Sequence, residues 1–294
     1  MDLHGRSVRR DVRELGALLG DVLANQPPDR GFETVESLRT DAIAFRRGRL
    51  ESREPLKRTL EALDSNLERA VARAFTTYFE LINLAEERQR VRAIREAEQS
   101  GTLEHGASET AKRLAAADPA TRRQVLADVL IEPTFTAHPT EARRKTVKAK
   151  LRSIAEAIES LDERRLLDSE RVQLERSIEA EVISLWQTAQ VRAGRPEPGD
   201  EARNVQWYFD NTLFDVIPEV YDELEAALDR EVDDPIEIPT VFEFHSWAGS
   251  DRDGNPHVTP EVTEAALDRH RELILDRYRS ELRTLTGVLS QDDQ

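Results

Sequence analysis

Apolar residues recur at three- and four-residue steps through most of the first 128 residues, which is the spacing of one face of an α-helix. The clearest stretch comprises Val12, Leu15, Leu18, Leu19, Val22 and Leu23. Helix-ending residues interrupt the pattern at Pro27–Pro28, Pro55, Gly101–Gly106 and Asp118–Pro119. Residues 1–128 are therefore expected to form a block of helices.

Two short runs in the rest of the chain have the composition of β-strands. The first is Ile131–Thr136, and the second is Ile236–Trp247, which contains Val241, Phe242 and Phe244. Helical spacing fills most of the remaining sequence, including a final helix that begins at Pro260. The predicted fold is mainly α with a few short strands, divided into a helical block at 1–128 and a strand-containing region at 129–294.

The charge balance of the chain limits its partners. It has 58 acidic and 42 basic residues and a net charge of −16, so the phosphates of a nucleic acid would meet a mostly repulsive surface. Only five of the basic residues are lysines. We expect a halophilic source, because salt at 1 M shortens the range of repulsion between carboxylates to about 3 Å.

Cysteine is absent, which excludes disulfides, thiolate nucleophiles and cysteine metal sites. No stretch approaches the roughly 18 continuous apolar residues of a membrane-spanning helix, and no apolar region follows the polar, basic N-terminus. The sequence therefore predicts a protein of the cytoplasm without membrane segments.

One histidine lies where the first predicted strand meets a cationic helix. The segment from Phe135 to Glu141 has the sequence Phe-Thr-Ala-His-Pro-Thr-Glu, and Arg143, Arg144 and Lys145 follow it. His138 could take and return a proton near neutral pH, and the cationic helix start favours a phosphate or carboxylate. A structural histidine and a solvated basic helix face would give the same pattern, and the residues alone leave both interpretations open.

A polar loop follows the second predicted strand, and three interpretations of it are possible. A calcium loop starting at Asp251 would require a glutamate at its twelfth position, where the chain has Val262. The Asp-Gly and Asn-Pro pairs within Asp251–Pro256 also suit a plain turn. In the third interpretation the segment is an active-site loop, in which Arg252 meets an anion and the flanking aspartates fix its direction.

A third segment contains two of the three tryptophans, Trp186 and Trp207, and the run Asp200–Asn204. Taken alone, this tryptophan-containing segment favours a packed core over a ligand site.

The histidine segment, the tryptophan-containing segment and the polar loop occur in the same order as in phosphoenolpyruvate carboxylase. Together they resemble that family over about residues 130 to 270. The resemblance assigns the catalytic histidine of the family's T-A-H-P-T-E motif to His138. It assigns the two basic residues that follow to Arg144 and Lys145, where the family commonly has two arginines. The family's G-G-D-R-D-G-N-P-N motif matches Asp251–Pro256, with departures at Ser250 and His257.

The resemblance also implies an activity. Family members form oxaloacetate and phosphate from phosphoenolpyruvate and bicarbonate, with Mg²⁺ or Mn²⁺, and so supply the tricarboxylic acid cycle. The substrate-binding residues that it implies for this chain are Arg144, Trp247, Arg252, Asp253 and Asn255. The metal ligands are expected in the later part of the family sequence, and none is assigned to this chain.

Family members are usually about three times as long as these 294 residues and have a (β/α)8 barrel, of which this sequence offers two strands. The resemblance therefore implies the N-terminal third of a helix-rich TIM-barrel enzyme, a fragment inactive alone, from a family that is typically tetrameric. The alternative is a non-catalytic helical binding or regulatory module that pairs with a complementary chain.

Overall fold

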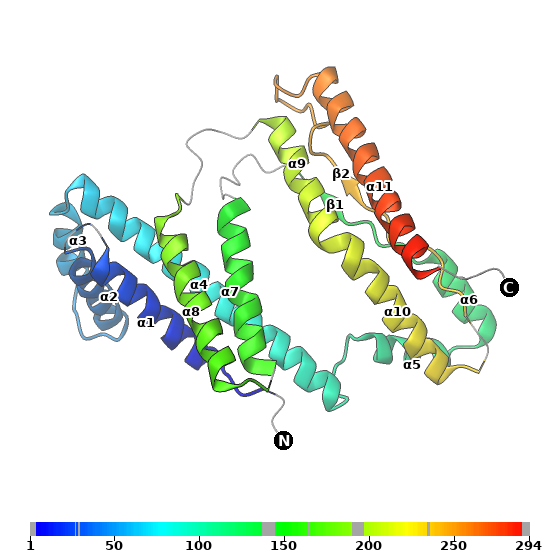
Figure 1. The fold of residues 1–294 in the computed structure, drawn as a ribbon, viewed down its shortest axis with the longest axis horizontal. Coiled ribbons are helices and arrows are strands. Elements are labelled where there is room, and N and C mark those ends of the chain that lie inside the picture. The colour runs from blue at the N-terminus through cyan, green and yellow to red at the C-terminus, as the bar shows by residue number, and fades with distance from the viewer. Residues whose placement is uncertain are drawn as a thin grey trace. The chain divides into compact units, whose positions relative to one another are not determined.

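The computed structural model of the protein describes residues 4–26, 28, 30–136, 145–163, 165–189, 197–233 and 236–289 (Figure 1). The chain divides into two compact units, each made of two separate stretches of sequence. Unit 1 contains Met1–Thr102 and Arg143–Arg192, and unit 2 contains Leu103–Ala142 and Ala193–Gln294. This division does not coincide with the one expected at residue 128, because helices on both sides of that residue belong to each unit.

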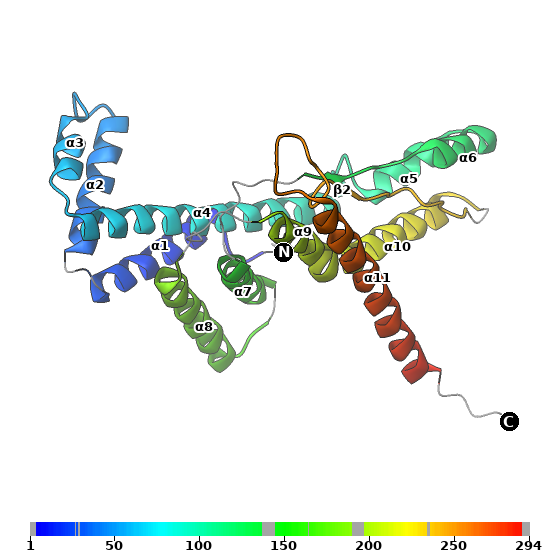
Figure 2. The ribbon, with the colours of Figure 1, turned by 90° about the horizontal axis from the view of Figure 1, so that it is seen from above.

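Unit 1 consists of helices in the part of the chain that the structure describes. They are α1 (Val8–Asn25), α2 (Gly31–Arg46), α3 (Glu54–Glu61), α4 (Ser65–Gln99), α7 (Lys145–Glu163) and α8 (Asp168–Gln187). Helices α1, α4, α7 and α8 pack side by side (Figures 1 and 2). The apolar faces that the periodicity predicted form one core, in which Leu81, Ile154 and Leu185 have almost no exposed surface.

Within unit 1, a buried ionic network binds the start of the chain to α4 and α7. Arg92 Nε donates to Asp162 Oδ2 at 2.7 Å, and Arg92 Nη1 lies 2.8 Å from Asp11 Oδ2. The backbone amides of Gly5 and Arg6 both donate to Asp162 Oδ1 at 3.0 Å. Because these side chains are 0 to 1 % exposed, each buried charge depends on its partner in the network.

Unit 2 combines helices with the only strands that the described residues form. Its elements are α5 (Ala107–Ala116), α6 (Pro119–Asp128), β1 (Thr134–Phe135), α9 (Pro198–Tyr208), a π-helical turn η1 (Phe209–Leu213), α10 (Phe214–Glu231), β2 (His245–Ser246) and α11 (Pro260–Val288). The prediction of a mainly helical chain with a few short strands is confirmed, although both strands are shorter than expected.

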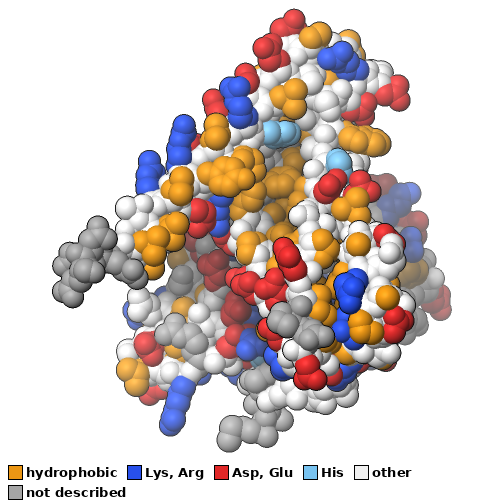
Figure 3. Space-filling model, turned by 90° about the vertical axis from the view of Figure 1, so that its right-hand side faces the viewer, with side chains coloured by type: hydrophobic (Ala, Val, Ile, Leu, Met, Phe, Trp, Pro, Cys, Tyr) orange, Lys and Arg blue, Asp and Glu red, His pale blue; other side chains and the backbone are white. Residues whose placement is uncertain are grey.

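Two small apolar clusters hold unit 2 together. Helices α5 and α10 pack through Ala111, Ala227 and Leu228. Helices α9 and α11 approach closely through Ala202 and Ala266, which are 0 % and 4 % exposed. The remainder of α11 is largely exposed, and Figure 3 shows hydrophobic side chains gathered on this side of the molecule. Among the described residues, no helix combines the length and the apolar character needed to cross a membrane.

Candidate active site

Strands β1 and β2 pair in parallel, although more than one hundred residues separate them in the sequence. Thr134 lies opposite His245 and Phe135 lies opposite Ser246, and the Trp247 amide donates to the Phe135 carbonyl at 2.9 Å. Both strands therefore end at the same edge of the sheet. The strand that precedes the histidine motif and the strand that precedes the Asp251–Pro256 loop are therefore neighbours, an arrangement that sequence alone did not predict.

The structure does not describe two of the predicted site residues. His138 and Arg144 lie outside the described residues, and His138 follows Phe135 by three positions in the sequence. Helix α7 begins at Lys145, which confirms helix in the described part of the segment that follows the histidine motif.

The loop after β2 is held by its own hydrogen bonds and by α11. The Trp247 carbonyl accepts the amides of Ser250 and Asp251 at 3.0 Å each, and the Trp247 side chain is 54 % exposed. Gly249 has φ +81°, and its carbonyl accepts a hydrogen bond from Thr263 Oγ1 at 3.0 Å. Since Thr263 belongs to α11, the first residues of the loop have a fixed position against that helix.

Two polar side chains of the loop accept hydrogen bonds that stabilise backbone turns. Asp251 Oδ1 accepts the Asp253 amide at 3.0 Å, and Asn255 Oδ1 accepts the His257 amide at 3.1 Å. Gly254, between them, has φ +68°. Among the described residues, no group with metal-ligand spacing includes the loop, which does not favour the calcium interpretation.

Arg252 has a different neighbour from the one expected. Its Nη2 lies 3.4 Å from Thr263 Oγ1, and within the described part of the chain no ion pair joins Arg252 to Asp251 or Asp253. The Asp251 side chain therefore shapes the backbone of the loop, and neither flanking aspartate holds the guanidinium in the described part of the chain. The pKa of Glu261 is lowered mainly by its hydrogen bonds with Thr259 and with its own backbone amide, and the charge of Arg252 adds a smaller effect in the same direction.

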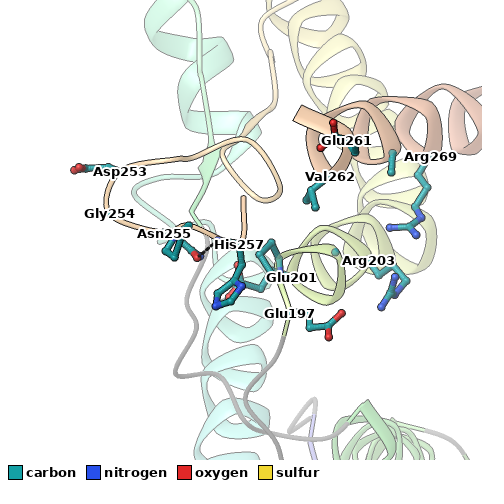
Figure 4. Close-up of a pocket in the computed structure, with 14 residues that line it drawn as sticks. Glu197, Glu201, Arg203, Asp253, Gly254, Asn255, His257, Glu261, Val262 and Arg269 are labelled. Atoms are coloured by element: carbon teal, nitrogen blue, oxygen red, sulfur yellow. Dashed lines mark hydrogen bonds between the residues drawn. The ribbon is translucent and has the colours of Figure 1, made fainter. Parts of the chain in front are cut away.

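A cavity of about 840 Å³ lies between the loop, the start of α9 and the start of α11. The loop contributes Asp253, Asn255 and His257, and Figure 4 shows the Asp253 carboxylate pointing away from the helices. Carboxylates and cations both line this cavity, so it has no single sign of charge. The geometry of the cavity is compatible with an active-site loop that binds a ligand, and it is also compatible with a plain turn.

Two arginines in this cavity were not among the predicted site residues. The Nη1 atoms of Arg203 on α9 and Arg269 on α11 lie 3.7 and 3.8 Å from the position that a Cβ on Gly199 would take. The sequence signal near Arg203 favoured a core segment, and the core interpretation holds for its neighbour Ala202. Nothing in the local sequence distinguished Arg269 from the other basic residues of a solvated helix.

A second, more apolar cavity of about 340 Å³ lies beside β2 and α11. Phe209, Phe214 and Phe244 line it together with His270 of α11, and burial lowers the pKa of His270. Phe209 belongs to the π-helical turn, and its ring packs against Phe135 and Phe244 at centroid distances of 5.5 and 5.4 Å. This aromatic packing supports the strand pair from one face.

The family model of phosphoenolpyruvate carboxylase matches residues 8–294. The chain belongs to the phosphoenolpyruvate carboxylase family. It is 37 % identical over 293 residues to the phosphoenolpyruvate carboxylase of Xanthomonas oryzae pv. oryzae (strain MAFF 311018), covering 97 % of this chain and 32 % of that relative. The identity is 38 % to the enzyme of Thermus sp. (strain 71), with the same coverage. The identity is 39 % over 290 residues to the enzyme of Roseiflexus castenholzii (strain DSM 13941 / HLO8), covering 95 % of this chain and 30 % of that relative.

The chain therefore spans about a third of the length of the curated relatives that it matches. Membership of the phosphoenolpyruvate carboxylase family confirms the resemblance carried by the motifs, and it does not favour the non-catalytic binding module. The structure adds that the departures from the family pattern, Ser250 and His257, lie at the two ends of a loop whose turns remain intact.

Proposed function

We propose that this chain supplies the N-terminal part of a phosphoenolpyruvate carboxylase, which forms oxaloacetate and phosphate from phosphoenolpyruvate and bicarbonate. The observation that supports the proposal is the parallel pairing of β1 with β2, because the two family motifs follow these strands in the sequence and the strands end at one edge of a sheet. Active sites of α/β barrels are built at the carboxyl ends of such strands.

In this proposal His138 is the acid–base group. Bicarbonate attacks the phosphoryl group of phosphoenolpyruvate and gives carboxyphosphate and the enolate of pyruvate. His138 then takes the carboxyl proton of carboxyphosphate, so that the C–O bond to the phosphoryl group breaks and CO₂ and phosphate separate. The enolate attacks CO₂ to give oxaloacetate.

The substrate-binding residues have positioning roles. Arg144 offers a cation close in sequence to His138, and Arg252 offers one on the motif loop. Trp247, Asp253 and Asn255 shape the pocket for bicarbonate and CO₂, and the exposed ring of Trp247 limits the access of water. The turns at Asp251 and Asn255 give the loop a defined backbone in advance of binding.

The family activity implies Mg²⁺ or Mn²⁺. The described residues around the motif loop do not fit such an ion, since no three of their carboxylate or imidazole groups come together at metal-ligand spacing. The ligands are therefore assigned to the part of the family sequence beyond this chain, and the roles of His138 and the loop are independent of them.

The same proposal covers the architecture and setting of the protein. Residues 129–294 contain the first strands of a (β/α)8 barrel, which a sequence as long as the relatives would complete. The 294 residues alone are inactive. The working enzyme is a cytoplasmic homotetramer from a halophile.

The test is oxaloacetate formation in molar KCl with Mg²⁺, by the chain alone and by a chimera in which it replaces the matching third of the Thermus sp. relative. We expect activity only from the chimera, and we expect His138→Asn to abolish it. His105→Asn, an exposed histidine outside the motifs, is the control and should remain active. A folded chimera without activity, or full activity of the His138→Asn chimera, would refute the proposal.

A further inference from the structure

Three side chains with metal-binding groups gather on the open face of the strand pair. They are Glu132, Glu243 and His245, which are called here the strand-face triad. Ile131 bridges Phe242 and Thr134 pairs with His245, so the same register places Glu132 opposite Glu243. The triad therefore comes from β2 and from the bridged segments just before β1 and β2, and owes its assembly to the parallel pairing.

The donor atoms of the triad are already close enough to share one ion. One ligand atom from each residue lies within 4.8 Å of the other two, and His245 Nε2 is 3.3 Å from Glu132 Oε1. Donors bound at about 2.0–2.2 Å to one tetrahedral metal are separated by roughly 3.4 Å. The distance between His245 and Glu132 meets this value, and small rotations of the Glu243 side chain would supply the third donor.

The backbone that carries the triad is fixed. The Glu243 amide donates to the Ile131 carbonyl at 3.0 Å, and the His245 amide donates to the Pro133 carbonyl at 3.1 Å. The opposite face of the strands is filled by the packed rings of Phe135, Phe242 and Phe244. Because side chains alternate along a strand, the triad must point to the open face, where Glu132 and His245 remain 55 % and 48 % exposed.

The charges of the triad favour a cation. Two carboxylates directly opposite each other on neighbouring strands repel, and no ion pair neutralises Glu243 among the residues that the structure describes. One imidazolium would balance only one of the two carboxylates. A divalent ion would balance both and would also use the nitrogen of His245.

We propose that the strand-face triad binds one divalent transition-metal ion, with Zn²⁺ and Co²⁺ as the best matches. The imidazole selects such ions over Mg²⁺ and Ca²⁺, which prefer oxygen ligands alone, and the two carboxylates complete a three-residue site with water in the open positions. The ion joins β1 to β2 on the side of the sheet away from the aromatic rings. It thereby stabilises the strand pair whose ends carry the two motifs.

The test uses the 294-residue chain in constant KCl. Co²⁺ is titrated while its visible absorption is followed, and Zn²⁺ binding is measured by calorimetry. We expect one equivalent of metal per chain, with affinity reduced at least tenfold in His245→Asn and in Glu243→Gln. Glu237→Gln and His105→Asn change exposed residues of the same types outside the triad, and they should bind like the parent.

Two results would overturn the proposal: no binding of either ion at about 100 μM, or equal affinity in the parent and both triad variants. Circular dichroism on each sample confirms that the variants are folded. Should one triad variant lose its fold, the other still decides the result, because both remove a ligand. An excess of Mg²⁺ that displaced Co²⁺ completely would also contradict the selectivity of the site.

Discussion

Gly249 lies at a tightly packed position of the candidate active site. With φ +81°, it occupies a conformation that side chains other than glycine rarely adopt. A Cβ at this position would be 2.9 Å from the Cβ of Ala266 and 3.5 Å from that of Ala202. Replacing Gly249 with alanine therefore strains the backbone and also pushes α11 and α9 away from the loop.

The size of the effect follows from these two causes. The left-handed conformation costs an alanine about 1 kcal/mol, and forcing a methyl group into a packed site costs about 1–3 kcal/mol more. We expect Gly249→Ala to lower the free energy of unfolding by about 2–4 kcal/mol in total. Gly254 is the matched control, because it has φ +68° in the same loop but no atom within 4 Å of its would-be Cβ. Gly254→Ala should cost only about 1 kcal/mol.

Urea unfolding at constant KCl, followed by tryptophan fluorescence, measures both variants. Trp207 and Trp247 belong to unit 2 and Trp186 to unit 1, and Trp247 precedes Gly249 by two residues, so two of the three tryptophans report on unit 2. If Gly249→Ala were no more destabilising than Gly254→Ala, the close approach of Ala266 would not constrain the loop, and the packing argument would be wrong.

Two further predictions concern the whole chain. Burial would raise the pKa of Asp162, but Arg92 and then His4 hold this pKa below the usual range. The stabilising effect of the ionised Asp162 is therefore complete above about pH 4, and it is lost as the pH falls through the lower pKa of the folded state. Urea titrations at neutral pH should show that Asp162→Asn lowers the free energy of unfolding by about 3 kcal/mol. The difference in this free energy between the variant and the parent should become smaller in acid. Asp21→Asn, which changes an exposed aspartate, should show neither effect. The acidic surface should make the fold depend on salt, and circular dichroism that stays unchanged down to about 0.1 M KCl would contradict the halophilic assignment.

The local pattern of the sequence was sufficient to predict most elements. Helix α1 carries the run from Val12 to Leu23 on its packed face, and α11 begins at Pro260 as the first-turn proline indicated. Both predicted strands exist, because the apolar runs at Ile131 and Val241 have no helical spacing. These features depend on neighbours within a few residues, which the sequence displays directly.

Features that depend on distant contacts were not predictable in this way. Helices α5 and α6 were assigned to the N-terminal block, but Ala111 of α5 packs against Ala227 and Leu228 of α10. The strand-face triad likewise requires the register that places Glu132 opposite Glu243, and no local signal specifies which strand is the neighbour. The motifs predicted candidate site residues, whereas the pairing of β1 with β2, which places the strands that precede the two motifs side by side, required the structure.

The polarity of the open strand face connects the two proposals. Parallel sheets are normally covered on both faces, and bulky branched residues usually fill the interior of a barrel, yet here Glu132, Glu243 and His245 occupy this face. If the chain forms part of a barrel, these carboxylates leave water and must be neutralised, which a bound cation achieves. Zn²⁺ should therefore bind more tightly to the chimera with the Thermus sp. relative than to the 294-residue chain. Equal affinities would mean that the triad still faces water in the longer protein, and the strand pair would then not have its open face inside a closed barrel.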